Sequence, residues 1–196
     1  MSGVYVKICG LRSAADARVA VEAAADAVGI VLSSTSPRAA TDAEALDVIG
    51  ASASADSVLV VHDLSIDDAI AAVERLGADV LQLHGYSDDD VRRAVAALPR
   101  VWRAAAGESA AAGSLGEEAL LLDSAVPGSG ERWDLGALET PEGRWLLAGG
   151  LSPDNVAQAV ADARPWGVDV SSGVESSRGV KSQELIRAFV VAAKSA

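Results

Sequence analysis

Residues 4–32 have the sequence VYVKICGLRSAADARVAVEAAADAVGIVL, in which two kinds of apolar spacing alternate. Val4–Ile8 and Ala27–Leu32 are short, β-rich apolar runs, whereas the Ala-rich stretch between them has helical spacing. Ser13 precedes that stretch, and Asp16 follows three residues later, a pattern in which side chains satisfy the amide groups of a first helical turn. This part of the chain therefore predicts a strand, a helix and a second strand.

The same alternation continues to the end of the chain. Ser/Thr-x-x-Asp/Glu pairs predict helix starts at Thr41, Ser65 and Ser87, and Ser152-Pro153 gives another kind of start signal. A last helix is expected from about Lys181 to Lys194. The further strand candidates are Ser57–Val61, Val80–Leu83, Val101–Ala104, Ala119–Leu122, Trp145–Ala148 and Val168–Ser171.

Strict alternation of strand and helix implies parallel strands joined by right-handed crossovers, and eight such units close into a barrel. We therefore expect an α/β fold, a single-domain (β/α)8 TIM barrel over residues 1–196, with an open doubly wound sheet as the alternative. The fifth and sixth helical segments are expected to be short or irregular. Ala104–Leu115 is rich in Gly, Ala and Ser, and Asp134–Glu139 leaves room for little more than one helical turn.

Composition narrows the class of protein. Half of the residues are apolar, and no stretch approaches the roughly 18 consecutive apolar residues that a membrane helix needs. The first residues lack the layout of a signal peptide, so a cytoplasmic protein is expected. Cys9 is the one cysteine, which excludes an intrachain disulfide and a cysteine-based metal cluster. We expect no metal.

The net charge is −12, from 16 basic and 28 acidic residues. This balance repels nucleic-acid phosphates, so nucleic acid is not an expected partner. A small anionic ligand remains compatible if a few basic side chains and backbone amides gather at one place.

Candidate catalytic residues follow two strands. Lys7 and Cys9 alternate onto one face of their strand, where a nearby cation would favour the thiolate and lower the pKa of Cys9, making it a base or nucleophile. A buried structural cysteine is the alternative. Asp123 comes directly after an apolar run, where a barrel places a general acid, although a loop-entry aspartate often binds backbone amides instead.

Candidate binding residues also lie at strand ends. Arg38 ends a polar loop and presents a planar fork suited to carboxylate or phosphate, although it is equally compatible with a solvated surface arginine. Gln82 and His84 share one face of the fourth strand, and a lone histidine there is more often structural than catalytic. Two glycine-containing turns follow the seventh and eighth strands, the usual phosphate site of this fold, although glycines also simply close turns. The candidate residues in these turns and in the strand end before the second one are Gly149, Gly150, Asp169, Ser171, Ser172 and Gly173.

These motifs, taken in order, closely resemble those of the phosphoribosylanthranilate isomerase family. The resemblance runs from the first strand into the last helix. It is carried by Lys7-Ile8-Cys9-Gly10-Leu11, Ser36-Pro37-Arg38, Gln82-Leu83-His84-Gly85, Leu121-Leu122-Asp123-Ser124, Gly149-Gly150-Leu151-x-Pro153-x-Asn155, Gly167-Val168-Asp169-Val170-Ser171-Ser172-Gly173-Val174-Glu175 and Gly179-Val180-Lys181.

The resemblance implies a cofactor-free Amadori rearrangement in tryptophan biosynthesis, with phosphoribosylanthranilate as the small anionic substrate. It implies Asp123 as general acid, Cys9 as general base and Arg38 as the clamp for the anthranilate carboxylate. Asp169, Gln82 and His84 would face the sugar or amine. Backbone amides around Gly149, Gly150, Ser171, Ser172 and Gly173 would hold the phosphate.

Two departures from the family pattern affect loops. Val31-Leu32 stands where an aromatic residue is often found, and Pro127–Asp134 replaces a usual Gly-Gly-Thr-Gly-like turn. The alternatives are a related histidine-pathway aminosugar isomerase or a dual-substrate barrel, both of which use two aspartates, and a non-catalytic phosphate-binding barrel. Cys9 at the end of the first strand argues against the two-aspartate enzymes, and retention of both Cys9 and Asp123 argues against a non-catalytic barrel. We expect a monomer, and we expect Lys7 to tune the thiol of Cys9.

Overall fold

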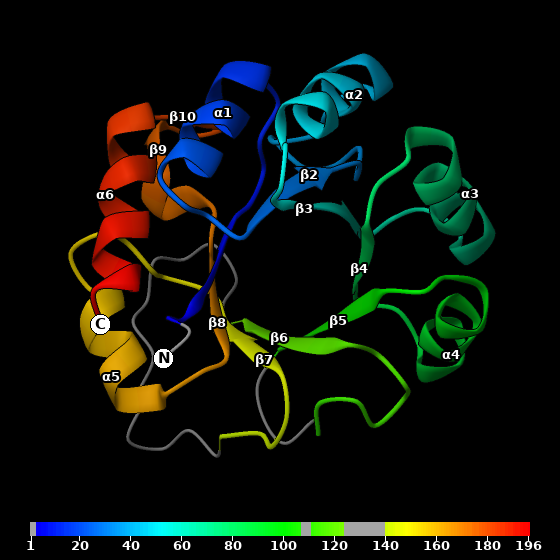
Figure 1. Ribbon diagram of the computed structural model, residues 1–196. Helices are drawn as coiled ribbons and strands as arrows, with labels where there is room; N and C mark the ends of the chain where they lie inside the picture. Colours follow the sequence, from blue (N-terminus) through cyan, green and yellow to red (C-terminus); the bar gives the residue numbers. More distant parts are fainter. Residues whose placement is uncertain (1–2, 107–110, 124–139) are drawn as a thin grey trace.

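The computed structural model describes residues 3–106, 111–123 and 140–196, and its centre is a closed barrel of eight parallel strands (Figure 1). Each strand pairs with the next in chain order, and the last pairs with the first, which confirms the barrel over the open sheet. The strands are β1 (Tyr5–Ile8), β2 (Ala27–Val31), β3 (Asp56–Val61), β4 (Val80–His84), β5 (Val101–Ala106), β6 (Ala119–Asp123), β7 (Trp145–Leu147) and β8 (Gly167–Val170).

Helices surround the barrel on the outside (Figure 1). They are α1 (Ala14–Glu22), α2 (Asp42–Ala51), α3 (Ile66–Leu76), α4 (Asp88–Ala97), α5 (Val156–Ala163) and α6 (Gln183–Lys194). In the described part of the chain no helix joins β5 to β6, and residues 112–115 form turns there. This agrees with the prediction that the fifth helical segment is short or irregular. The predicted sixth segment, Asp134–Glu139, and the atypical loop Pro127–Asp134 lie outside the described residues.

Four of the predicted helix caps are confirmed. Ser13, Thr41, Ser65 and Ser87 each accept a hydrogen bond from the amide three residues later, and at Thr41 the reciprocal bond to Glu44 completes a capping box. These bonds satisfy amide groups that have no partner inside the helix.

The predicted start of α5 at Ser152-Pro153 is wrong. The helix begins at Val156, after Asn155. The Asn155 side chain accepts from the Ser152 amide and donates to the Gly150 carbonyl, both at 2.8 Å. The Ser152 carbonyl also accepts from the amides of Asn155 and Val156 at 3.2 and 3.1 Å, so the segment before Val156 is a turn and the regular helix starts one turn later.

Side chains fill the barrel so that one end is closed. Tyr5 stacks on Trp166 with ring centroids 4.3 Å apart, and Trp102 meets both rings edge-on. This aromatic cluster lies at the amino-terminal end of the strands, where barrel residues serve stability. The candidate site residues therefore share the opposite, carboxyl-terminal end. No helix in the described ranges has the length and apolar character to span a membrane.

Short hydrogen-bonded elements follow β8 and complete that end of the barrel. The 3-10 turn η1 (Ser172–Val174) leads into a small antiparallel hairpin of β9 (Glu175–Ser177) and β10 (Val180–Lys181). A β-carbon on Gly173 would lie 1.8 Å from the Leu151 carbonyl oxygen, so this turn packs directly against the loop after β7. The two glycine-containing loops thus form one surface.

Candidate active site

Cys9 lies just past the end of β1, in a space that a glycine leaves open. Its amide donates to the Val170 carbonyl at 2.8 Å, and the side chain is buried. A β-carbon on Gly29, which lies on β2, would be 2.9 Å from Cys9 Sγ and 3.1 Å from Lys7 Cε. With any other residue here the thiol or the strand would have to move, so glycine at this strand position leaves room for both side chains.

Lys7 lies below Cys9 and is paired with Asp169. The two residues are register partners on β1 and β8, and Lys7 Nζ donates to Asp169 Oδ1 at 2.8 Å. The Lys7 side chain is wholly buried and that of Asp169 is 10% exposed. A buried charge is costly unless it is paired, so barrel closure is what makes this lysine tolerable.

The surroundings of Cys9 raise the pKa of its thiol. Burial has the largest effect, the Lys7 charge opposes it, and the nearby Asp169 carboxylate adds to it. The expectation that Lys7 holds the pKa below its ordinary value is therefore wrong for the ligand-free protein. Lys7 does lower the pKa, but desolvation and the Asp169 counter-charge outweigh it.

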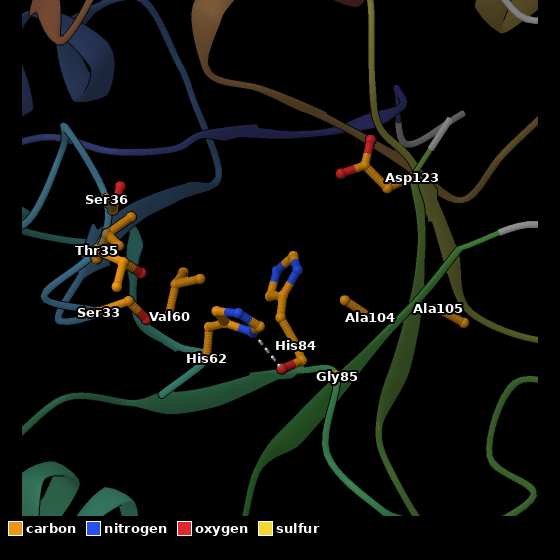
Figure 2. Close-up of a pocket in the computed structure, with 11 residues that line it drawn as sticks. Ser33, Thr35, Ser36, Val60, His62, His84, Gly85, Ala104, Ala105 and Asp123 are labelled. Carbon is orange, nitrogen blue, oxygen red and sulfur yellow. Dashed lines mark hydrogen bonds between the residues drawn. The ribbon is translucent and has the colours of Figure 1, made fainter. Parts of the chain in front are cut away.

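A cavity of about 620 Å³ opens at the carboxyl-terminal end of β2 to β6. Apolar side chains of Val31, Val60 and Ala104 line it, together with polar groups of the loop Ser33–Ser36. Figure 2 shows the His84 ring projecting into this space, with Asp123 on one side and the Ser33–Ser36 loop on the other. The cavity is suited to a flat, largely apolar group with polar edges.

A second, more polar cavity of about 240 Å³ adjoins the first. It is formed by the loops after β7 and β8. Asp123 lines both cavities, so its carboxylate lies where they meet. The residues around the second cavity are Arg38, Asp123, Ala148, Gly149, Gly150, Leu151, Asp169, Val170, Ser171 and Ser172.

Gln82 and His84 form a hydrogen-bonded pair inside the barrel. Gln82 is fully buried, and its Nε2 donates to Nε2 of His84. Burial, with a smaller effect of the Lys7 charge, lowers the pKa of His84 to about 4. The imidazole is therefore neutral near neutral pH and presents one donor and one acceptor. His62 approaches from β3, with Nδ1 3.2 Å from the His84 carbonyl oxygen.

Arg38 is held by an acidic residue of the hairpin that follows β8. Its Nη2 donates to Glu175 Oε2 at 3.0 Å, and its Nε bonds Oε1. Lys181 Nζ also donates to Glu175 Oε1 at 3.0 Å and to the Ser171 carbonyl at 2.8 Å. Although burial raises the pKa of Glu175, bonds from Arg38, the Gly179 amide and Lys181 outweigh it and bring the pKa to about 2.

Comparisons with known proteins agree with this geometry. The family model described as N-(5'-phosphoribosyl)anthranilate (PRA) isomerase matches residues 6–192. The chain belongs to the phosphoribosylanthranilate isomerase family. The N-(5'-phosphoribosyl)anthranilate isomerase of Geobacter sp. (strain M21) is 42% identical over 201 residues, covering 96% of this chain and 97% of the relative.

Solved isomerase structures have the same fold. TrpF from Jonesia denitrificans is 50% identical with a TM-score of 0.91, covering 97% of this chain and 96% of that one. A phosphoribosyl anthranilate isomerase solved in complex with reduced 1-(o-carboxyphenylamino)-1-deoxyribulose 5-phosphate is 27% identical with a TM-score of 0.83, covering 98% of this chain and all of that one. The TIM-barrel class of this phosphoribosylanthranilate isomerase family member is thus supported independently.

Every site residue expected from the sequence lies at or just below this end of the barrel. Residues that line a cavity directly are His84 in the first, Arg38, Gly149, Gly150, Asp169, Ser171 and Ser172 in the second, and Asp123 in both. Cys9 and Gln82 are buried beneath the surface. Gly173 supports the phosphate-side loop by its contact with Leu151.

Sequence reasoning missed four contributors to the isomerase site. Glu175 and Lys181 appear in the recognised motifs, but nothing local indicates that they bind Arg38 or Ser171. Gly29 carried a usable signal, because glycine inside a strand often marks a close approach of another group. His62 follows β3 and had no distinguishing pattern.

Proposed function

We propose that this chain isomerises N-(5-phosphoribosyl)anthranilate to 1-(2-carboxyphenylamino)-1-deoxyribulose 5-phosphate in tryptophan biosynthesis. The observation that carries the proposal is the position of Asp123 between a largely apolar cavity and a polar one, at the barrel end where Cys9 lies. An aromatic amine fits the first cavity and a sugar phosphate the second. The relative solved with a reduced form of this product supports the same substrate.

In the proposed reaction Asp123 is the general acid. Its carboxyl donates a proton to the furanose ring oxygen as the bond between that oxygen and C1 breaks, and the nitrogen lone pair forms the C=N bond of an open iminium. Its place at the end of β6, where the two cavities meet, suits a group that must reach the bond between amine and sugar.

Cys9 is the general base of the second step. Its thiolate removes the proton at C2, and the electrons of that bond form the C1–C2 double bond of an enolamine. Ketonisation then places a proton on C1 and releases one from the C2 hydroxyl. The hydrogen count and oxidation level of the whole molecule do not change, so the reaction needs no external redox cofactor.

The remaining site residues bind the substrate. Arg38 clamps the anthranilate carboxylate. Asp169, Gln82 and His84 contact the sugar and amine, either directly or by orienting one another. The loops with Gly149, Gly150, Ser171, Ser172 and Gly173 hold the phosphate. Gly149 and Gly150 have positive φ angles of 83° and 65°, which glycine adopts without strain, and the absence of side chains lets backbone N–H groups approach a phosphate closely.

We further propose that the protein is a single-domain monomer of the cytoplasm. The large apolar side chains that are exposed in the described residues lie on three different elements, Leu46 on α2, Val180 on β10 and Val191 on α6. Such scattered exposure does not favour a dimer interface. Light scattering of the purified protein tests this, and a mass twice that of the chain would contradict it.

The decay of anthranilate fluorescence with freshly generated phosphoribosylanthranilate tests the function. We expect wild-type turnover, with kcat reduced about a hundredfold or more in Cys9→Ala and in Asp123→Asn. Asp162→Asn on the outer surface of α5 is the matched control and should retain activity. An inactive wild type, or catalytic variants as fast as wild type, would reject the proposal, and the histidine-pathway aminosugar would then be tested.

A further inference from the structure

Lys7 is a fully buried lysine that the proposed reaction does not use. Its side chain has no solvent exposure, and it is absent from the lining of both cavities. Removing an ammonium group from water costs several kcal/mol, and an apolar side chain would fill the same space without that cost. A charge in this place calls for a role beyond packing.

The charge of Lys7 is directed at Cys9. The position that a β-carbon of Gly29 would occupy is 2.9 Å from Cys9 Sγ and 3.1 Å from Lys7 Cε. Both atoms lie close to this one position, so Cys9 Sγ is near Lys7 Cε, the carbon that carries the ammonium group. Because residue 29 is glycine, no side chain from that position lies against the two groups.

Asp169 opposes Lys7 from the neighbouring strand. Its carboxylate accepts from Lys7 Nζ at 2.8 Å and also lines the polar cavity. The carboxylate cancels part of the lysine charge and places a negative charge near the thiol. It also links the buried pair to the space that the substrate enters.

Two further cationic side chains interact with the Cys9 thiol, and the charge of each is balanced by the Glu175 carboxylate. Lys181 on β10 and Arg38 in the loop after β2 interact electrostatically with the thiol. Both also bind Glu175. Among residues 3–106, 111–123 and 140–196, the charged groups found to act on Cys9 are Lys7, Asp169, Lys181 and Arg38, and the first two belong to the strands that hold it.

We propose that Lys7 and Asp169 are opposed positioning residues that govern how readily Cys9 gives up its proton, Lys7 promoting thiolate formation and Asp169 restraining it. The proposal rests on the proposed role of Cys9 as the base. Burial, reinforced by Asp169, keeps Cys9 protonated against the opposing effect of Lys7. A change in the position or charge of Asp169 when substrate enters then favours the thiolate.

The two charges predict opposite effects of mutation. Asp169→Asn keeps the shape and a hydrogen-bond acceptor for Lys7 but removes the negative charge, so the thiol should ionise at lower pH. Lys7→Met removes the cation, so the thiol should ionise at higher pH. A merely structural role for the pair predicts no such opposition.

Thiolate formation is measured by its ultraviolet absorbance as a function of pH, as the difference between each protein and its Cys9→Ser counterpart. Cys9 is the one cysteine of the chain, so the signal has a single source. We expect the thiolate fraction at a fixed pH to rise about tenfold in Asp169→Asn and to fall by a similar factor in Lys7→Met. Asp56→Asn, which alters the closed end of the barrel near Tyr5 and Arg100, is the matched control and should leave the titration unchanged.

Two results would overturn the inference: an unchanged midpoint in Asp169→Asn, or a shift of both variants in the same direction. If Lys7→Met does not fold, Asp169→Asn alone decides. The titration does not require turnover, so it remains informative if phosphoribosylanthranilate proves not to be a substrate. Where the wild type is active, the acidic limb of the kcat/KM profile should move with the thiol midpoint in each variant.

Discussion

Arg38 and Glu175 form a bidentate ion pair between the loop after β2 and the hairpin after β8, 137 residues apart in sequence. Glu175 also accepts from the Gly179 amide at 3.0 Å and from Lys181, so the carboxylate itself is held on several sides. The guanidinium is thereby ordered before any ligand binds. Preorganisation of this kind reduces the free-energy cost of binding.

Glu175→Gln should weaken binding of the carboxylate-bearing substrate through Arg38. We expect KM for phosphoribosylanthranilate to rise about tenfold, corresponding to about 1.4 kcal/mol, with a smaller change in kcat. In an Arg38→Met background the same substitution should add little, because the group that it positions is gone. Glu44→Gln, which breaks the outer ion pair with Arg12, is the control. Equal losses in both backgrounds would argue against coupling.

The acid stability of the protein should depend on Glu175. Its pKa lies near 2 in the folded protein against an ordinary value of 4.5, so the unfolded chain takes up the proton first as the pH falls. The stabilisation is present above about pH 4.5 and is lost as the pH falls toward 2. Urea unfolding of wild type and Glu175→Gln across this range checks it. The variant should show the shallower decline, and parallel curves would contradict the assignment.

His84 should make stability depend on pH in a higher range. Its pKa is about 4 in the folded protein and 6.5 ordinarily, so between these values the unfolded chain binds a proton that the folded protein does not. Stability therefore falls as the pH decreases from 6.5 to 4. His84→Gln should flatten this part of the curve. NMR titration of the His84 ring gives an independent check, and a midpoint near 6.5 would show that the imidazole is not perturbed.

Gly29→Ala should disable the site without changing the fold class. The added methyl group would lie 2.9 Å from Cys9 Sγ, so the thiol or the strand must move. Overpacking of this kind costs about 1–3 kcal/mol, and the displaced base should lower kcat at least about tenfold. Gly50→Ala is the matched control, because nothing lies within 4 Å of that position on α2. A fully active Gly29→Ala would show that the close approach is not needed.

Gly173→Ala should disturb the phosphate side of the site. A β-carbon there would lie 1.8 Å from the Leu151 carbonyl oxygen, which forces apart the loops after β7 and β8. We expect a higher KM and weaker competitive inhibition by inorganic phosphate, while the pH midpoint of the Cys9 thiol stays at the wild-type value. Inhibition by phosphate at wild-type strength would place the phosphate elsewhere.

Local sequence patterns were sufficient for the fold. The spacing of apolar residues, and capping pairs such as Thr41 with Glu44, involve residues within one or two helical turns of one another. The sequence alone therefore predicts the elements that they define. The alternation they define placed Cys9 and Asp123 at the ends of their strands and Asp169 within the last strand. The regular part of α5 starts one turn later than predicted because residues 153–155 form a turn, and the local pattern at Ser152-Pro153 does not indicate this turn.

The sequence by itself thus determined the barrel, its carboxyl-terminal site and the family to which its motifs belong. Only the tertiary structure decided which charges meet. Closure of β8 onto β1 brings Asp169 into register with Lys7, and the hairpin after β8 brings Glu175 to Arg38. The proton affinity of Cys9 depends on the balance between desolvation and these charges. That balance is set by distances between residues far apart in the chain, which no local pattern encodes.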